Sequence, residues 1–535
     1  MRPAPVAAWT FAVAATLCPA ADLYRVAGAV VNAQTGAPVP HAEVYIYKSG
    51  TAFPRAPFVA GVDGRFTFDL PEGAYVLRAG TRVRVENYGE QNQENGFGSA
   101  VIVGPGQDTG TLVFRWFPAA AIFGTVVDDS GEPVEGALVQ LLRSHVAVGH
   151  RVTATFRWYR TNDRGEFRFG QLPGAGRYYL AVTGTPWYEA GARAMAGEEP
   201  AAHPAAFIPV YYPNTSDAAR ATPLLVAPGE ETRADFTLTT AVGATVTVTH
   251  SGPADLKGSV SLTRDGIAGI DSFQEQQALT AVNGAAGKIP QLLTGVPPGH
   301  YVVSVTGTSG KSYLAGRTAI DVNGSDVGVE VPLRPAATIG GSVQFLNPAA
   351  KPAGTLRVAL QVDGVGAVLN AAVRPDGSFL FPDVPHGEYR IGAVGVGFFV
   401  SHSEAAGVPF RDGLLTVTEG DAGTVSLTIS NETGRLNGFV MNGDRPAAAV
   451  MVVLARAEES RNPVHYRGYQ TESDGSFDYR NIPAGSYSLF AVEDTSFEYA
   501  NPDAVRPYLA DAKAVRIEPH GMSTERIPVT PARPQ

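Results

Sequence analysis

The chain has 535 residues, of which 44% are hydrophobic and 17% charged, and its net charge at neutral pH is −10. This length allows several domains, and the acidic balance without a basic stripe excludes a surface built to neutralise nucleic-acid phosphates. Glycine (60 residues) and proline (40 residues) follow no collagen period and stand between short apolar runs. That distribution is typical of an all-β protein with many tight turns.

Residues 1–21 predict an export signal peptide. Arg2 precedes an apolar stretch over residues 6–17, and small residues at Ala20 and Ala21 follow it. The stretch is shorter than the roughly 20 residues that span a bilayer, so we expect cleavage after Ala20 or Ala21 and membrane contact only through this signal. The protein is then exported to the periplasm, the outer surface or the medium. The single cysteine, Cys18, lies in this segment, and its lipidation stays open.

A turn-and-strand unit recurs along the rest of the chain. In its last copy, Asp474-Gly475 supplies a tight turn, and Phe477 and Tyr479 alternate with polar residues as in a half-buried strand. A Pro-x-Gly turn then leads into a second strand. Spacings of roughly 90 to 120 residues between copies fit small β-sandwich domains and are too long for solenoid repeats. The equivalent tyrosines are Tyr75, Tyr178, Tyr301, Tyr389 and Tyr487.

The repeat predicts an all-β chain of five tandem transthyretin-like or immunoglobulin-like β-sandwich domains, with short helical turns in loops. Linkers such as Trp116-Phe-Pro118 and Leu333-Arg-Pro335 contain proline, which favours semi-rigid extension over loose tethering, and whether the rod is straight or folded back stays open. Residues 86–98 are polar and glycine-rich and predict a loop. The expected domains are β-sandwich 1 over 22–117, β-sandwich 2 over 118–240, the divergent β-sandwich 3 over 241–334, β-sandwich 4 over 335–431 and β-sandwich 5 over 432–530.

The order of motifs resembles the carboxypeptidase regulatory-like domain, a transthyretin-related β-sandwich. Each unit runs from a glycine-containing strand through a proline-rich turn, an Ala-x-Val strand and Asp-Gly-x-Phe-x-Phe to Pro-x-Gly-x-Tyr. Gly124-Thr-Val-Val with Pro133-Val-Glu-Gly-Ala137 is among the best matches. The resemblance implies about seven strands in two sheets, exported bacterial arrays, and carbohydrate or protein binding in related folds. It implies no catalytic residues, because the chemistry of the carboxypeptidases belongs to a separate domain.

The sequence predicts no catalytic residue, no metal ligand and no cofactor. The ten histidines are scattered and form no His-Glu-x-x-His pair, and no nucleophile elbow is present. The best ligand candidates are aromatic, because sugar rings stack on Trp and Tyr. An alternative is that these side chains cover a small core or a domain interface. They are Trp158, Tyr159, Trp187, Tyr188, Tyr211 and Tyr212, all in the second domain.

Three functions from different classes follow from these observations. The leading one is a non-enzymatic, exported, structural or adhesive scaffold at the cell surface. The second is a carbohydrate-binding protein that uses the aromatic residues of the second domain. The third is an enzyme or a hydrolase accessory, for which no paired nucleophile and base is present. The expected partners are a polysaccharide or an envelope protein, and the oligomeric state stays open.

Overall fold

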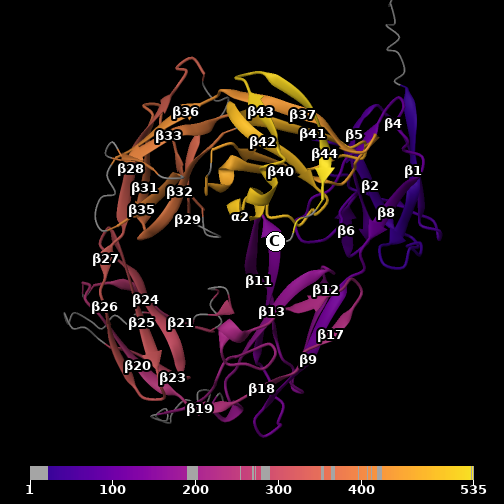
Figure 1. Cartoon of the computed structure of the whole chain (residues 1–535). Coiled ribbons are helices and arrows are strands. Elements are labelled where there is room, and N and C mark those ends of the chain that lie inside the picture. The colour runs from indigo at the N-terminus through magenta and orange to yellow at the C-terminus, as the bar shows by residue number, and fades with distance from the viewer. Residues whose placement is uncertain are drawn as a thin grey trace, which may run out of the picture.

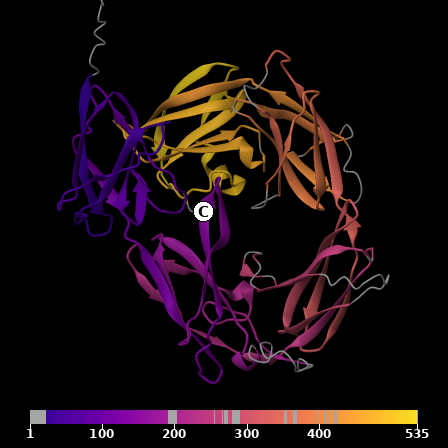
Figure 2. The same cartoon turned by 180° about the vertical axis from the view of Figure 1, so that it is seen from behind.

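The computed structural model describes residues 22–531 and 533, apart from 190–202, 254, 265, 268–269, 271–272, 279–289, 351–354, 363–367, 396, 406–407, 411–412, 419–423 and 459. The expected signal peptide and Cys18 therefore lie outside the described residues. The chain forms five β-sandwich domains, as the repeat predicts, and each has its own hydrophobic core. The domains follow one another around a ring (Figures 1 and 2).

All five domains share one strand order around their first strand. This strand pairs antiparallel with the strand that follows the Asp-Gly turn or its equivalent, and parallel with a strand near the end of the domain. In domains 1, 2, 4 and 5 the parallel neighbour approaches this strand so closely that a glycine is required there, whereas β20 of domain 3 contains no glycine. In the fifth domain a Cβ atom built on Gly438 would lie 1.8 Å from the carbonyl oxygen of Glu525. The parallel pairs are β1 with β8, β9 with β17 and β18, β20 with β26, β28 with β36 and β37 with β44.

Domain 1 contains β1 (Leu23–Asn32), β2 (Glu43–Lys48), β3 (Phe58–Val59), β4 (Arg65–Pro71), β5 (Gly73–Thr81), β6 (Arg84–Asn87), β7 (Val101–Val103) and β8 (Leu112–Trp116). Domain 2 contains β9 (Ala120–Asp128), β10 (Leu138–Ala147), β11 (His150–Arg160), β12 (Glu166–Leu172), β13 (Gly176–Thr183), β14 (Ala205–Phe207), β15 (Val210–Tyr211), the 3-10 helix η1 (Ala218–Arg220), β16 (Leu224–Val226), β17 (Glu231–Arg233) and β18 (Phe236–Leu238).

Domain 3 contains β19 (Thr240–Val242), β20 (Ala244–His250), β21 (Lys257–Arg264), β22 (Phe273–Ala278), β23 (Gln291–Val296), β24 (Gly299–Ser309), β25 (Ser312–Val322) and β26 (Val327–Val331), and β27 (Arg334–Pro335) links it to domain 4. Domain 4 contains β28 (Ala337–Phe345), β29 (Arg357–Val362), β30 (Val368–Ala372), β31 (Ser378–Val384), β32 (Gly387–Val394), β33 (Phe399–Ala405), β34 (Val408–Pro409), β35 (Leu414–Val417) and β36 (Val425–Ser430). Domain 5 contains β37 (Thr433–Asn442), β38 (Arg445–Pro446), β39 (Met451–Arg456), η4 (Pro463–His465), β40 (Tyr466–Gln470), β41 (Ser476–Pro483), β42 (Gly485–Val492), α2 (Pro502–Val505), η5 (Arg506–Tyr508), β43 (Lys513–Ile517) and β44 (Met522–Thr530).

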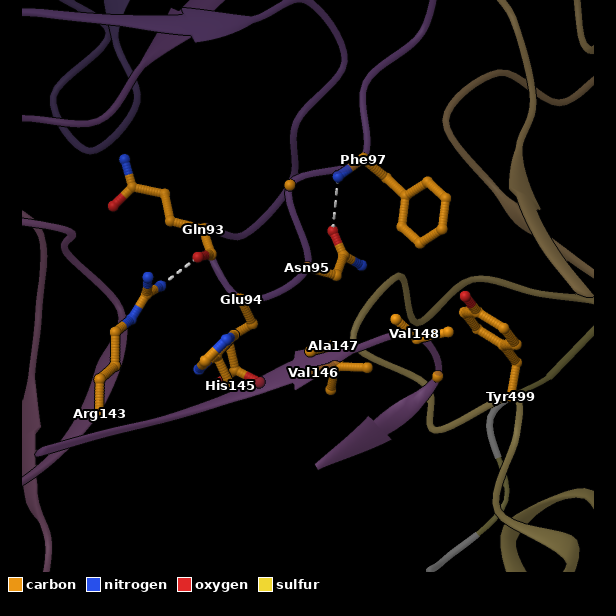
Figure 3. A pocket seen from close by; sticks show the side chains of 12 residues that line it. Gln93, Glu94, Asn95, Phe97, Arg143, His145, Val146, Ala147, Val148 and Tyr499 are labelled. Carbon is orange, nitrogen blue, oxygen red and sulfur yellow. Dashed lines mark hydrogen bonds between the residues drawn. The ribbon is translucent and has the colours of Figure 1, made fainter. Parts of the chain in front are cut away.

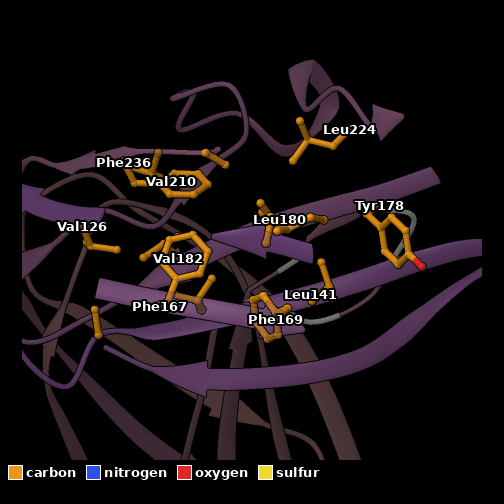
Figure 4. Packing of buried hydrophobic residues seen from close by; sticks show 14 of the residues in the cluster. Val126, Leu141, Phe167, Phe169, Tyr178, Leu180, Val182, Val210, Leu224 and Phe236 are labelled. Atoms are coloured by element: carbon orange, nitrogen blue, oxygen red, sulfur yellow. The ribbon is translucent and has the colours of Figure 1, made fainter. Parts of the chain in front are cut away.

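Domain 2 shows how the alternating pattern builds a core. Phe167 and Phe169 of β12 point inward from one sheet, and Leu141 of β10 and Leu180 of β13 point inward from the other (Figure 4). Residues two apart on a strand share a face, so the apolar side chains of both sheets meet between them. The core is therefore the direct product of the Phe-x-Phe and Tyr-x-Leu alternation in the sequence.

The repeat tyrosines have a common role that the sequence pattern alone did not show. Each hydroxyl donates a hydrogen bond to the carbonyl of a proline four or five residues earlier, which closes the Pro-x-Gly turn. Because each ring is also buried in a domain core, one side chain ties the turn to the packing. The bonds join Tyr75 to Pro71 (3.0 Å), Tyr178 to Pro173 (2.7 Å), Tyr301 to Pro297 (2.7 Å), Tyr389 to Pro385 (2.8 Å) and Tyr487 to Pro483 (2.7 Å).

The chain is folded back and not straight, because domain 5 returns to domain 1. Short strand pairs stabilise two of the links: β14 pairs with β19 between domains 2 and 3, and β25 pairs with β27 at the start of domain 4. Each link turns the chain in the same sense, and the yellow domain 5 lies beside the indigo domain 1 in both views (Figures 1 and 2). The proline-containing linkers thus hold a bend. Within the described residues, no helix has the length and apolar character needed to cross a membrane.

Candidate functional site

The aromatic residues predicted to bind a ligand do not form one surface. Trp158 is 70% exposed on β11, and its neighbour Tyr159 packs edge-on against Phe169 with ring centroids 6.2 Å apart. Consecutive residues of a strand point to opposite faces, so Trp158 and Tyr159 cannot stack on the same ligand face. Trp187, 77% exposed, forms a separate edge-to-face pair with the exposed Tyr188 (5.7 Å). Ligand binding by these four residues stays a prediction.

The prediction that Tyr211 binds a ligand is wrong, because its side chain is buried, whereas Tyr212 is only partly buried and its ligand binding stays a prediction. Tyr211 is fully buried (0% exposed) and packs with Leu142 and with Ile267 of domain 3. Tyr212 packs against the core of domain 2. Tyr211 therefore helps to fix domain 3 against domain 2. This agrees with the alternative that the aromatic side chains cover a domain interface.

The strongest concentration of specific contacts lies where the ring closes, between domains 1 and 5. We call the contact of residues 89–102 with residues 470–473 the seam. The backbone N–H of Ser473 donates to the carbonyl of Ala100 (3.0 Å), and the backbone N–H of Ile102 donates to the hydroxyl of Ser473 (2.9 Å). The amide of Gln470 donates to the carbonyl of Gly89 (2.8 Å). Residues 470–473 lead directly into the Asp474-Gly475 turn, so the repeat unit of domain 5 carries the docking surface.

Two further contacts extend the seam along the loop of domain 1. The Ser99 hydroxyl donates to the carbonyl of Thr471 (2.7 Å), and Gln91 donates to the carbonyl of Ala449 (2.6 Å). Phe97 packs into a second apolar cluster of domain 5, where its ring meets Tyr499 edge-on at 6.2 Å. The seam is therefore a polar strip with one aromatic anchor.

The long hairpin of β10 and β11 extends from domain 2 to the contact between domains 1 and 5. Arg151 at the start of β11 bonds to Glu94 of domain 1 (3.1 Å) and to Glu498 of domain 5 (3.2 Å). The N–H of Ala500 donates to the carbonyl of Gly149 at the hairpin tip (3.0 Å). All three side chains of the ion-pair group are mostly buried, so the pairs are screened less than surface pairs. One arginine thus joins three domains.

Burial perturbs the carboxyl groups around this junction. Desolvation raises the pKa of Glu86 to about 7, although the N–H of Phe117 (2.9 Å) and the guanidinium of Arg84 (3.2 Å) favour the charged form. Burial also raises the pKa of Glu90 and of Glu472, which accepts hydrogen bonds from Tyr469 and from the N–H of Ala100. The closed ring therefore holds carboxyl groups that titrate above their ordinary range.

A hollow of about 520 Å³ lies at the junction of domains 1, 2 and 5. Residues 93–97 of domain 1 form one side, residues 143–149 of the hairpin form another, and Tyr499 of domain 5 closes the end (Figure 3). Its walls combine Arg143, His145 and Asn95 with Phe97 and Tyr499. Desolvation, with the nearby charge of Arg143, lowers the pKa of His145, so this imidazole is neutral at pH 7.

The described residues hold no group of three or more His, Cys, Asp or Glu side chains placed to bind a metal ion. The chemistry that the junction offers is hydrogen bonding, ion pairing and apolar contact.

The sequence does not predict the junction, although one signal for it is present. Residues 86–98 are rich in Glu, Gln and Asn, and an ordered loop of this length in a compact domain is usually functional. Nothing in the pattern says that this loop docks on a domain more than 350 residues away.

Comparison with known proteins places domain 2 in a family. Residues 121–239 match the carboxypeptidase regulatory-like domain, so the resemblance read from the sequence is confirmed for this domain. The search of curated protein sequences found no significant match to the chain.

Several solved structures of bacterial proteins resemble the chain weakly. The Bacillus anthracis TIE protein is 12% identical over 72% of this chain and 65% of its own, with a TM-score of 0.15. GBS52, the minor pilin of Streptococcus agalactiae, is 16% identical over 37% of this chain and 98% of its own (TM-score 0.18). BcpA, the major pilin subunit of Bacillus cereus, is 13% identical over 58% and 99% (TM-score 0.13). At these scores the likenesses carry no argument about function or domain arrangement.

Proposed function

We propose that this chain, whose domain 2 belongs to the carboxypeptidase regulatory-like family, is a non-catalytic scaffold that works as a closed ring. The observation that carries the proposal is the seam between domains 1 and 5, reinforced by Arg151 of domain 2. A tether that only spaces its ends would gain nothing from such contacts, whereas a scaffold that presents its outer faces in fixed positions requires them.

The pattern of residues 1–21 supports export, so the ring acts outside the cytoplasm, where it presents its domains to an envelope protein or a polysaccharide. The mature chain, cut after Ala20 or Ala21, contains no cysteine. Each domain then depends on packing and on the Tyr-to-Pro hydrogen bonds for stability, and the ring depends on the seam.

Small-angle X-ray scattering tests the closed ring directly. The substitution Arg151→Glu places a third carboxylate between Glu94 and Glu498, and repulsion at this mostly buried site should open the ring. We expect a larger radius of gyration and maximum dimension than in the wild-type chain, with unchanged far-UV circular dichroism.

The matched control is Arg168→Glu, which breaks an exposed ion pair with Glu231 inside domain 2. This variant should scatter like the wild type, because exposed pairs contribute little and this one joins no domains. A wild-type chain that already scatters as an extended rod would refute the proposal.

A further inference from the structure

Strand β11 lies at one edge of its sheet in domain 2, and among the described residues it pairs only with β10. The N–H of Thr161, the residue after the strand, donates to the carbonyl of Ala137 (3.0 Å). Backbone groups alternate in direction along a strand, so the N–H and carbonyl groups of Arg160 and Trp158 point away from β10. These groups form no hydrogen bond within the described part of the chain, so residues 157–160 present an open sheet edge.

The side chains along this open edge carry positive charge that no carboxylate neutralises. Trp158 is 70% exposed, and Arg157 and Arg160 on either side of it are exposed as well. The guanidinium of Arg157 donates to the carbonyl of Gly170 (2.7 Å), and that of Arg160 donates to the carbonyl of Gly136 (3.0 Å). Neither arginine forms an ion pair with a described residue, although the net charge of the chain is −10. Both charges are therefore free to meet an acidic partner.

The edge lacks the features that usually protect an exposed strand. Proteins hide such edges with proline, with very short strands or with a covering element. Strand β11 has eleven residues and no proline. Its irregular pairing falls between Thr155 and Arg157, so the register is regular over residues 157–160. Two copies of this edge would bring like charges together, which disfavours self-pairing.

We propose that residues 157–160 of β11 bind an extended acidic segment of a partner protein, which adds a strand to the sheet. The backbone of the segment pairs with the free N–H and carbonyl groups of Trp158 and Arg160, and an apolar side chain rests on the Trp158 ring. Carboxylates beside Arg157 and Arg160 then lie three residues apart in the segment. The proposal rests on the scaffold function for the class of partner, an exported or envelope protein.

Isothermal titration of the full chain tests this assignment with three synthetic peptides. The first has the core Glu-Val-Thr-Glu with threonines on both sides, the second has lysine in place of both glutamates, and the third is the first with every backbone nitrogen methylated. The first should bind about tenfold more tightly than either of the others, because the second has the wrong charge and the third cannot donate backbone hydrogen bonds. No detectable binding of the first peptide would overturn the site.

A matched pair of variants isolates the backbone contact. Trp158→Pro and Trp158→Thr both remove the indole, but only Trp158→Pro also removes the outward N–H. Proline costs no hydrogen bond to β10 at this position, because edge strands accept it where the N–H faces solvent. The first peptide should bind Trp158→Pro about tenfold more weakly than Trp158→Thr. Equal affinities, or equal binding of the methylated and unmethylated peptides, would overturn strand addition.

Charge reversal tests the chemistry of the partner. Arg160→Glu should weaken binding of the glutamate peptide about tenfold and strengthen binding of the lysine peptide. The control is Arg65→Glu at a site in domain 1 whose side chain is 79% exposed, and it should change neither affinity. Equal binding of both peptides to the wild type would overturn the acidic class.

A polysaccharide partner would give a different pattern. Glycan-array binding that is lost in Trp158→Thr, without binding of the glutamate peptide, would assign the edge to a glycan and overturn the proposal. The closed ring is judged by scattering without peptide, so its failure and the failure of this edge are separate results.

Discussion

The backbone N–H of Ser473 in domain 5 donates a hydrogen bond of 3.0 Å to the carbonyl of Ala100 in domain 1. This bond joins the two terminal domains of a five-domain chain. Substitutions at this contact can therefore test the arrangement of the domains, and substitutions within the cores can test the individual folds.

A disulfide should trap the closed ring at this bond. Paired backbones bring Cα atoms within about 5.5 Å, which is within the reach of a disulfide. In a Cys18→Ser background, Ala100→Cys with Ser473→Cys should form an intramolecular cross-link that changes mobility on a non-reducing gel. Ala100→Cys paired with Ser130→Cys, at an exposed turn of domain 2, should not cross-link. Only intermolecular products from the first pair would contradict closure within one chain.

Removing the hydroxyl of a repeat tyrosine should destabilise its own domain. Tyr487→Phe keeps the buried ring but leaves the carbonyl of Pro483 without its donor, which costs about 1 kcal/mol. Urea unfolding followed by far-UV circular dichroism should show a transition at a lower urea concentration than in the wild type. Tyr188→Phe, on an exposed ring, should leave the unfolding curve unchanged, and equal curves for both variants would contradict the role of the bond.

Gly438 should not tolerate a side chain. Its Cβ atom would lie 1.8 Å from the carbonyl oxygen of Glu525, so Gly438→Ala must push β37 and β44 apart. Overpacking of this kind costs about 1–3 kcal/mol, and we expect a lower melting temperature or insoluble protein. Gly392→Ala, also within a strand but with no atom within 4 Å of the new Cβ, is the control and should melt like the wild type.

The raised pKa of Glu86 should make stability depend on pH. The folded pKa, about 7, lies above the ordinary 4.5, so the folded state binds the proton more tightly than the unfolded state. Protonated Glu86 contributes up to about 3 kcal/mol to the free energy of unfolding. This contribution is complete below pH 4.5 and is lost as the pH rises through 7. The urea midpoint should therefore fall between pH 5 and pH 8.

Glu86→Gln should flatten that fall, although Glu90 and Glu472 shift in the same direction and preserve part of it. Glu231→Gln is the control, because hydrogen bonding to Arg168 lowers the pKa of Glu231. An unchanged pH slope in Glu86→Gln would contradict the assignment.

The exposed aromatics of domain 2 remain candidates for sugar binding. If the chain binds a glycan by stacking, Trp158→Ala or Trp187→Ala should reduce binding on a glycan array at least tenfold. Leu225→Ala removes an exposed apolar side chain elsewhere in domain 2 and serves as the control. Full binding by both tryptophan variants would remove this site.

The domains could be predicted because their signals are local. Gly165 and Gly475 adopt positive φ as their Asp-x-Gly and Asp-Gly turns require, and the Phe-x-Phe strands that follow are buried as the alternation indicates. Asp217 and Asn501 cap short helical turns, which agrees with the short helical turns expected in loops. These features depend on residues within about ten positions of one another.

The ring and the junction could not be predicted in the same way. Arg151, Glu94 and Glu498 meet only because successive domain links add up to a closed path. Proline in the linkers indicates that they are stiff but does not indicate the angle between successive domains. Stiff bent linkers produce a ring, whereas stiff straight linkers produce a rod. The burial of Tyr211 could not be predicted for the same reason, since one of its neighbours, Ile267, belongs to the next domain.

The seam also decides how the molecule would respond to mechanical tension. A pull between residue 22 in domain 1 and residue 531 in domain 5 would load the hydrogen bonds at Ala100 and Ser473 before any hydrophobic core. Rupture of this short strip and of the contacts of Arg151 and Gly149 would release the length of the whole five-domain chain while every sandwich stays folded. The ring would then lengthen in one step and could re-form when the tension ends.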